Sequence, residues 1–286
     1  MKIGIVSAQV FPIPPLGYAG LEMIVWQRAK GLAGLGHKVT VFAPDGSTCP
    51  GCEIVPTGPP GGWDESQAYG KYWQKLLEQD CIIDDSWGKW SYLLKMEGRL
   101  KAPILGVMHA PVDTMFKSLP AGVDKPCFVC ISDDQRNHFE CLFNHPARTA
   151  YNGFDTSFYR PMSIPRSDRF LFLARFSTIK GPLIAIEACL EAGVGLDLVG
   201  DTSITNEPDY LEKCKQAAEK TSPGWDVEKR GKQIRIIGGV SRAETVRWYS
   251  QALALIHPIR DFREPFGLAP VECQACGTPV IAWNRG

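Results

Sequence analysis

The sequence predicts an α/β protein with two doubly wound, Rossmann-like domains. Short apolar runs rich in Val, Ile and Leu alternate with longer segments of helical spacing along the chain. A polar, proline-containing segment, residues 153–168, separates two series of this alternation. Strands that are buried on both faces and separated by helices form parallel sheets covered on both sides. We therefore expect one domain over residues 1–157 and a second over 158–286.

Each series supplies its own strands. The first begins with a buried strand at 2–7, a helix at 21–36 that ends at glycine, and a strand at 38–44. Further strands of this series are expected at 81–85, 103–109, 126–132 and 148–152. The second series is expected to form strands at 169–175, 195–201, 233–239, 252–258 and 278–284, with helices between them.

Composition excludes several classes of protein. The 31 basic residues balance the 31 acidic ones, so the chain lacks the basic surplus of a nucleic-acid-binding protein. No apolar run approaches the ~20 residues that a transmembrane helix needs. The first residues are interrupted by prolines and resemble a strand rather than a signal peptide, and the ten cysteines should then be reduced thiols. We expect a cytoplasmic protein, and whether it forms a homo-oligomer stays open.

Ligands of such sheets bind beyond the carboxyl ends of the strands, so the loops that follow strands carry the candidate residues. The first loop, residues 7–22, lacks the dinucleotide fingerprint G-x-G-x-x-G. Instead Gly17-Tyr18-Ala19-Gly20 opens a helix. Glycines at a helix start allow an anion to approach the backbone N–H groups, although a plain strand–helix turn has the same sequence features.

The second domain has a basic pair after its first strand. Arg175 closes the strand, and Lys180 follows five residues later, just before a helix. An arginine and a lysine at one strand end could neutralise a diphosphate. Basic residues near helix starts are common, so this pair alone leaves an ordinary surface role open.

The stretch EPFGLAPVECQACGTPV, residues 264–280, places two glutamates around a turn that leads into a helix. Glu264 lies in the loop after a strand, and Glu272 lies one turn into the helix. The backbone N–H groups of Phe266, Gly267 and Leu268 lie between the two. A carboxylate accepts two hydroxyl hydrogens at once, which suits a ribose diol or a pair of sugar hydroxyls.

This E-x7-E stretch, with PFGL after the first glutamate and CGTPVIA after the second, resembles the signature of the retaining glycosyltransferases of family 4, glycosyl transferases group 1. Other stretches agree with the family in order and spacing, namely PPLGYAGLE, GHKVTVFA, DDSWG, HA at 109–110, YNGFDTSFYRP, AR…KGP and DLVGD. The resemblance covers nearly the whole chain. It implies the GT-B fold, with an acceptor domain first and a domain that binds a nucleotide-sugar donor second.

The resemblance also implies roles for individual residues in binding the donor. Glu272 would bind the ribose hydroxyls of a nucleoside-diphosphate sugar. Glu264, with the backbone from Phe266 to Leu268, would hold the transferred sugar. Arg175 and Lys180 would clamp the diphosphate and stabilise the departing nucleotide.

In the first domain the resemblance assigns Gly17 and Gly20 to the phosphates and His109 to the neighbourhood of the sugar and the reacting centre. A single histidine at a strand end is often structural, and here the neighbouring matches favour the functional interpretation.

The chain departs from the family pattern in three places. Where relatives often read H-D-H-S-W-G, residues 83–88 read Ile-Asp-Asp-Ser-Trp-Gly, which removes a histidine from the acceptor side. Ala174 replaces a glycine that commonly precedes the arginine. The chain ends at Gly286, where the family continues with further strands and a helix, so we expect a second domain that is incomplete at its C-terminus.

Cysteine pairs invite a metal interpretation that the spacing does not favour. Cys127 and Cys130 lie in a predicted strand, where an odd separation turns them to opposite faces. Cys273 and Cys276 occupy packing positions on the signature helix. Only Cys49 and Cys52, in TCPGC, resemble a loop pair suited to metal or redox chemistry. We expect no metal and no cofactor.

The predicted activity is metal-independent transfer of a hexose, with retention of anomeric configuration, to an unknown acceptor. PPLGYAGLE favours a UDP-glucose-like donor over GDP-mannose. A glycoside hydrolase also uses two carboxylates but needs no diphosphate clamp. A sugar-nucleotide epimerase of the same fold, and a catalytically silent protein or fragment that binds nucleotide sugars, also fit these motifs.

Overall fold

The computed structural model describes residues 1–17, 19–62, 64–115, 123, 126–202, 207 and 209–285. The chain divides into two compact units, Met1–Phe154 and Asp155–Gly286. The boundary expected from the sequence, between residues 157 and 158, lies three residues further along. Tyr18 of the first predicted loop and the terminal Gly286 lie outside the described residues.

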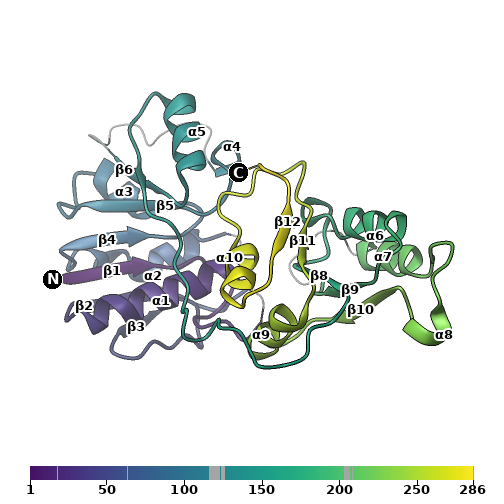
Figure 1. Cartoon of the computed structure of the whole chain (residues 1–286). Coiled ribbons are helices and arrows are strands. Elements are labelled where there is room, and N and C mark those ends of the chain that lie inside the picture. Colours follow the sequence, from purple (N-terminus) through teal and green to yellow (C-terminus); the bar gives the residue numbers. More distant parts are fainter. Residues whose placement is uncertain are drawn as a thin grey trace. The chain divides into compact units, whose positions relative to one another are not determined.

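Unit 1 contains a seven-stranded sheet of order β3-β2-β1-β4-β5-β6-β7, in which every pair of neighbours is parallel. Its strands, drawn in Figure 1, are β1 (Lys2–Val6), β2 (Lys38–Ala43), β3 (Glu53–Pro56), β4 (Cys81–Asp84), β5 (Ile104–Met108), β6 (Cys127–Cys130) and β7 (Arg148–Thr149). The helices are α1 (Gly20–Gly34), α2 (Ser66–Leu76), α3 (Ser91–Met96), α4 (Val112–Met115) and α5 (Asp133–Phe143).

Two hydrophobic cores form because successive strand residues point to opposite faces of the sheet. Ile3 and Ile5 of β1 pack into the core that contains Val25 and Ala29 of α1. Val6 packs into the other core, together with buried residues of α2, α3 and α5. The sheet is therefore covered on both faces, as the uninterrupted apolar runs predict.

Unit 2 repeats this plan with five parallel strands in the order β10-β9-β8-β11-β12. The strands are β8 (Phe170–Leu173), β9 (Leu196–Val199), β10 (Ile234–Gly238), β11 (Leu255–His257) and β12 (Val280–Ala282). The helices are α6 (Pro182–Glu191), α7 (Tyr210–Ala218), α8 (Val227–Arg230), α9 (Arg242–Gln251) and α10 (Leu268–Ala275), with a 3₁₀ turn η1 (Thr178–Lys180). A core of buried residues from β8, β9, β10, α6 and α7 lies on one face of this sheet.

The predicted fold class is confirmed, because both sheets are parallel and doubly wound. Each strand expected from the sequence is present, with ends that are trimmed by one or more residues. β3 was not predicted. It lies at the sheet edge with half-buried or exposed residues and ends in Pro56, so it lacks the apolar run that marks the central strands.

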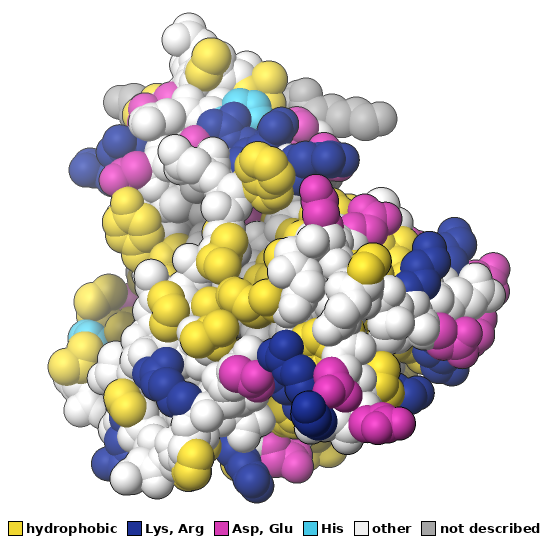
Figure 2. Space-filling model, turned by 45° about the vertical axis from the view of Figure 1, so that its right-hand side comes forward, with side chains coloured by type: hydrophobic (Ala, Val, Ile, Leu, Met, Phe, Trp, Pro, Cys, Tyr) yellow, Lys and Arg dark blue, Asp and Glu magenta, His cyan; other side chains and the backbone are white. Residues whose placement is uncertain are grey.

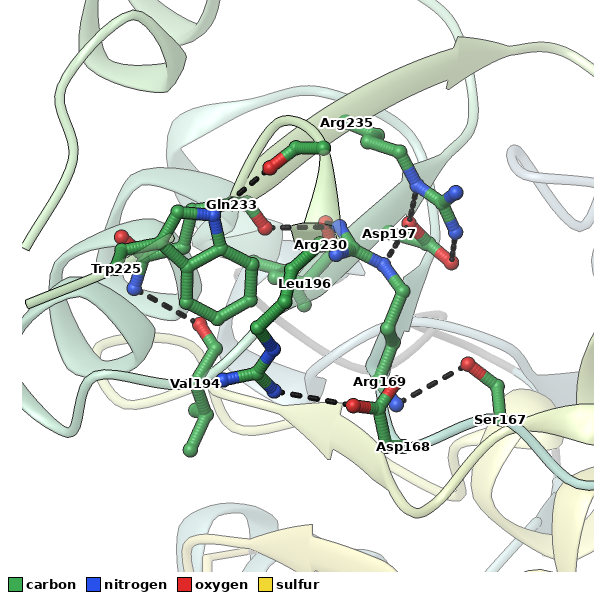
Figure 3. A network of polar contacts seen from close by, with 11 residues as sticks. Ser167, Asp168, Arg169, Val194, Leu196, Asp197, Trp225, Arg230, Gln233 and Arg235 are labelled. Carbon is green, nitrogen blue, oxygen red and sulfur yellow. Dashed lines mark hydrogen bonds and ion pairs between the residues drawn. The ribbon is translucent and has the colours of Figure 1, made fainter. Parts of the chain in front are cut away.

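A buried ion-pair network ties the amino ends of β8, β9 and β10 together (Figure 3). The Arg169 Nε atom lies 2.9 Å from Asp197 Oδ1, and its Nη2 atom donates to the carbonyl oxygens of Leu196 and Gln233 at 2.8 Å. Arg235 makes two bonds of 2.6 Å to the same aspartate. Arg169 and Asp197 are almost fully buried, so these contacts take the place of the water that would otherwise solvate both charges.

The surface drawn in Figure 2 carries basic and acidic side chains interspersed with one another rather than one patch of a single sign. This agrees with the equal numbers of the two charges in the chain. Among the helices that the structure describes, none combines the length and apolar character needed to cross a bilayer.

Replacing Asp197 with alanine should destabilise unit 2 by about 3–5 kcal/mol, since it leaves the buried Arg169 charge without its counter-ion. The free energy of unfolding from urea titration measures this loss. Asp168→Ala is the matched control, because Asp168 pairs with Arg230 at the exposed surface and such pairs contribute about 1 kcal/mol or less. Equal losses in the two variants would contradict the role given to burial.

Candidate functional site

The strand order gives each sheet a topological switch point, where chain direction along the sheet reverses. In unit 1 it lies between β1 and β4, and in unit 2 between β8 and β11. Ligands of doubly wound sheets bind outside the carboxyl ends of the strands at this point. Arg175 and Lys180 follow β8, and Glu264 follows β11, so both loops of the unit 2 switch point carry predicted residues.

The loop after β8 packs closely against the end of β11. Gly181 follows η1 with φ of +69° and precedes Pro182, the first residue of α6. A Cβ atom at Gly181 would lie 3.0 Å from the carbonyl oxygen of Pro258, just after β11. The glycine thus permits both the left-handed turn and the close approach of the two loops.

Lys180 and Glu264 form an ion pair across this approach, with Lys180 Nζ donating to Glu264 Oε2. The lysine side chain is 11% exposed and the glutamate 20%, so the pair is largely screened from water. The ammonium group also lies 5.7 Å from the centre of the Phe262 ring. The structure therefore joins two predicted residues that are 84 positions apart in the sequence.

Glu264 packs beside the start of α10. Gly267 is the N-cap with φ of +76°, and Leu268 begins the helix. A Cβ atom at Gly267 would lie 3.7 Å from Glu264 Cγ and 3.5 Å from Pro270, which sits in the first turn. Phe266, just before this N-cap, is half-buried. The segment thus has the predicted turn-to-helix geometry.

Glu272 has a different set of partners. The hydroxyl of the fully buried Tyr249, from α9, donates to Glu272 Oε2 at 3.3 Å, and the Tyr159 hydroxyl also bonds to this carboxyl group. Burial raises the pKa of Glu272, while these hydroxyls and the charge of Arg242 act in the opposite direction. Arg242 lies over the rings of Phe158 and Tyr159, at 5.1 and 5.4 Å from their centres.

His257, the last residue of β11, was missed by the sequence analysis. Burial lowers its pKa to about 4, and Lys180 contributes to the decrease while Glu264 opposes it. Its Nε2 atom is buried and has no hydrogen-bond partner among the described residues. A histidine followed by proline at a strand end was the signal available in the sequence.

In unit 1, His109 follows β5 and its side chain is 4% exposed. His109 Nε2 lies 2.7 Å from Asp85 Oδ1, and Arg28 Nη1 lies 2.6 Å from both oxygens of the same carboxylate. Asp85 follows β4 and is completely buried. Sequence reasoning missed Arg28 and regarded Asp85 only as a departure from a family pattern.

The loop after β1 leads to α1, which begins at Gly20. Its N-cap, Ala19, offers no side-chain hydrogen bond to the helix start. A Cβ atom at Gly17 would meet nothing within 4 Å, so no packing within the described residues requires this glycine. The neighbouring Glu22 is buried, which raises its pKa to about 7 against the opposing effect of the N–H groups of Glu22 and Phe11.

Comparison with known proteins finds a family that the second unit resembles. Residues 162–286 match the sequence profile of the family described as glycosyl transferases group 1. The match lies wholly within unit 2 and covers less than half of the chain. The matched segment contains the Lys180–Glu264 pair and Glu272, whereas His109 and the other residues of unit 1 lie outside it.

Two curated relatives are D-inositol 3-phosphate glycosyltransferases. The enzyme numbered 1 from Catenulispora acidiphila is 33% identical over 156 residues, which cover 47% of this chain and 34% of the relative. The enzyme from Pseudarthrobacter chlorophenolicus is 30% identical over 129 residues, which cover 43% of this chain and 28% of the relative. The chain therefore spans about a third of the length of the curated relatives it matches.

Solved structures share the fold over the whole chain. Sucrose-phosphate synthase from Thermosynechococcus elongatus has a TM-score of 0.78 at 20% identity, with 100% of this chain and 82% of the other covered. HepE from Anabaena, in complex with UDP-glucose, has a TM-score of 0.73 at 18% identity, with 100% and 81% covered. AviGT4, a glycosyltransferase involved in avilamycin A biosynthesis, has a TM-score of 0.68 at 22% identity. The match covers 100% of this chain and 79% of AviGT4. The two Rossmann-like units are those of the GT-B glycosyltransferase fold.

The cysteines of the chain are free thiols. Cys273 and Cys276 of unit 2 are buried, and burial raises the pKa of both. Burial also raises the pKa of Cys49 to about 12 and increases that of Cys52, which makes both thiols weak nucleophiles. Over the described ranges, no three residues among His, Cys, Asp and Glu are grouped so that they could hold a metal ion.

Glu22→Gln should change how the stability of unit 1 depends on pH. The folded pKa of about 7 exceeds the ordinary 4.5, so the folded state holds the proton more tightly and stability falls as pH rises from 4.5 through 7. The variant removes this titration. Above pH 7 its free energy of unfolding should therefore exceed that of the native chain by up to about 3 kcal/mol. Below pH 4.5 the two should be equally stable.

Urea unfolding between pH 4.5 and 8.5 measures the difference. Glu97→Gln is the control, since Glu97 is exposed and should not alter the slope. A stability difference that does not change with pH would show that Glu22 keeps an ordinary pKa in the folded chain.

Proposed function

We propose that this chain is a retaining hexosyltransferase that moves a sugar from a nucleoside-diphosphate donor, UDP-glucose-like, to the hydroxyl of an acceptor without a metal ion. The observation that carries the proposal is the Lys180–Glu264 pair at the switch point of a group 1 glycosyl transferase unit. A cation for phosphate oxygens and a carboxylate for sugar hydroxyls then lie side by side. A sugar diphosphate presents both groups within one molecule.

Glu272 is assigned to the ribose of the donor. An ionised carboxylate has about four lone-pair positions, and two tyrosine hydroxyls occupy part of this capacity. The remaining positions suit the two hydroxyls of a ribose. Tyr249 and Tyr159 orient the carboxyl group for this contact, because their own hydroxyls hold it from two different segments.

Arg175 and Lys180 are assigned to the diphosphate. Arginine offers a planar fork of donors and lysine a mobile charge with three donors, so Lys180 keeps its bond to Glu264 while it donates to phosphate. Positive charge at this place stabilises the negative charge that develops on the leaving group, the part that a divalent ion has in other transferases. Glu264 and the backbone from Phe266 to Leu268 are assigned to the transferred sugar.

Unit 1 contributes Gly17 and Gly20 for approach to the phosphates and His109 for contact with the sugar. In the proposed reaction the bond between the anomeric carbon and the diphosphate oxygen breaks, and its electron pair leaves with the nucleotide. The acceptor oxygen attacks the same face of the sugar and forms the new bond, while its proton passes to the departing phosphate. Retention by this route needs no nucleophile from the protein.

The donor assignment draws on similar proteins. The curated relatives are named as D-inositol 3-phosphate glycosyltransferases, and HepE has been crystallised with UDP and with UDP-glucose. A binding protein of the same fold that has lost turnover is the competing hypothesis from another class. Such a protein would make the same contacts to the nucleotide but would not transfer the sugar.

A panel of UDP, GDP and ADP with their sugar conjugates tests the function. A ligand that binds the folded chain raises the apparent melting temperature by mass action, so UDP and UDP-glucose should give the largest increases. Release of free nucleotide from UDP-glucose is then followed with candidate acceptors such as inositol phosphates. Binding without release favours the silent protein, and no increase with any nucleotide refutes the proposal.

Glu272→Ala should weaken affinity for the preferred nucleoside diphosphate by roughly 1–3 kcal/mol, the scale of a lost hydrogen bond to a charged group. Isothermal titration calorimetry measures it, after circular dichroism has shown that the variant is folded. Glu187→Ala on the exposed side of α6 is the matched control and should bind as the native chain does. Unchanged affinity in Glu272→Ala would remove this residue from the nucleotide site.

A further inference from the structure

A chain of three charged or ionisable groups runs through unit 1 at the carboxyl ends of β4 and β5. Arg28 from α1, Asp85 after β4 and His109 after β5 are joined by contacts of 2.6 and 2.7 Å through the one aspartate. The carboxylate of Asp85 is 0% exposed, and the His109 side chain is 4% exposed. Arg28 is 24% exposed and connects this pair to the surface.

The charge state of the pair follows from its surroundings. Burial opposes ionisation of Asp85, yet Arg28 and His109 outweigh it and hold the pKa of this carboxyl well below its usual range. Burial lowers the pKa of His109, and the positive charges of Lys89 and Arg28 add to the decrease, against the effect of Asp85. At neutral pH an ionised Asp85 therefore faces a neutral His109.

An ionised carboxylate can only accept hydrogen bonds, whereas a neutral imidazole donates from one nitrogen and accepts at the other. The contact between His109 Nε2 and Asp85 Oδ1 must then carry its proton on Nε2. Nδ1 keeps its lone pair, and the described residues give it no hydrogen-bond partner.

We propose that Arg28 and Asp85 are positioning residues that hold His109 as the Nε2–H tautomer, so that Nδ1 accepts a hydrogen bond from a hydroxyl of the transferred sugar. Arg28 keeps Asp85 ionised, and Asp85 fixes both the ring orientation and the site of the proton. The contact with the sugar rests on the proposed function. The tautomer does not, because it follows from the contacts within unit 1.

This arrangement selects the chemistry of the ligand atom. A lone pair on Nδ1 attracts the O–H of a sugar and repels the oxygens of an ionised phosphate, which only accept hydrogen bonds. His109 is therefore suited to a sugar hydroxyl and unsuited to the diphosphate. The charge of Asp85 is essential to this tautomer, because an ionised carboxylate cannot donate a hydrogen bond. A neutral partner at position 85 could donate to Nε2, and the proton of His109 would then lie on Nδ1.

Further ionisable groups lie near the Asp85–His109 pair. Lys89 is buried beside the pair, its Nζ donates to the carbonyl of Ser86, and burial lowers its pKa. Asp84 and Glu65 oppose that decrease. Asp84 is bonded to Ser86 and Ser91, and Glu65 accepts from the backbone N–H groups of 87 and 88. Neither of these two carboxylates bonds to His109.

Nitrogen NMR of the full chain, selectively labelled with ¹⁵N-histidine, tests the tautomer without any ligand. The protonated and unprotonated nitrogens of a neutral imidazole have well-separated chemical shifts, and the chain has five histidines. His109→Gln identifies the signals of His109. At pH 7.5 we expect Nε2 in the protonated position and Nδ1 in the unprotonated one, and the reverse pattern or a doubly protonated ring would overturn the proposal.

Two variants test whether Asp85 causes this pattern. Asp85→Asn should exchange the two shifts, because Arg28 attracts the amide oxygen and leaves the amide N–H₂ to donate to Nε2. Asp84→Asn removes a comparably buried carboxylate that does not contact His109, and the shifts should stay as in the native chain. An unchanged pattern in a folded Asp85→Asn chain, or equal changes in both variants, would refute positioning by Asp85. If neither variant folds, the spectrum of the native chain still decides the tautomer.

The same labelled protein tests the sugar contact. UDP-glucose should displace the Nδ1 signal towards the hydrogen-bonded position, and UDP should not. An equal displacement by UDP, or none by UDP-glucose at saturating concentration, refutes the contact while leaving the tautomer result intact. Failure of every nucleotide to bind would count against the proposed function and not against the positioning of His109.

Discussion

Parallel pairing is the constraint on which this molecule depends. When every strand points the same way, the loops that follow the strands gather along one edge of the sheet, whatever their distance in the sequence. Lys180 and Glu264 meet for this reason, as do Asp85 and His109. The helices on both faces supply the burial that makes these meetings electrostatically strong, since charges removed from water interact through a lower effective dielectric constant.

Buried charges differ between the amino ends and the carboxyl ends of the strands in unit 2. At the amino ends, Asp197 is saturated by Arg169 and Arg235, and Arg169 fills its remaining donors with backbone carbonyls. Such a network holds three strands in register. At the carboxyl ends, Lys180 and Glu264 have a single strong contact with each other and keep donors and acceptors available. The buried charges at the amino ends of the strands are therefore structural, and those at the carboxyl ends are the ones assigned to a ligand in the proposed function.

Much of the fold could be predicted from the sequence, because buried parallel strands are continuous apolar runs with clear ends. The edge strand β3 could not, since Glu53 and Pro56 carry no such pattern. In the candidate site, the linear motif around Glu264 predicted the turn that leads into a helix, and the ligand roles of its residues stay predictions. The buried environments of Asp85 and His257 were not predicted, because they depend on partners from other strands, which no local pattern encodes. The tyrosine partners of Glu272 were hidden for the same reason.

The ion pair of Lys180 with Glu264 also bears on which molecules the switch point of unit 2 rejects. Two opposite charges in contact form a dipole with no net charge, so a simple anion meets repulsion from the carboxylate together with attraction from the ammonium group. Under the proposed function, free phosphate would gain little from contact with this ion pair. A molecule with an anionic group and alcohol groups at matching separation would satisfy both partners at once, so the pair would favour a sugar diphosphate over inorganic phosphate.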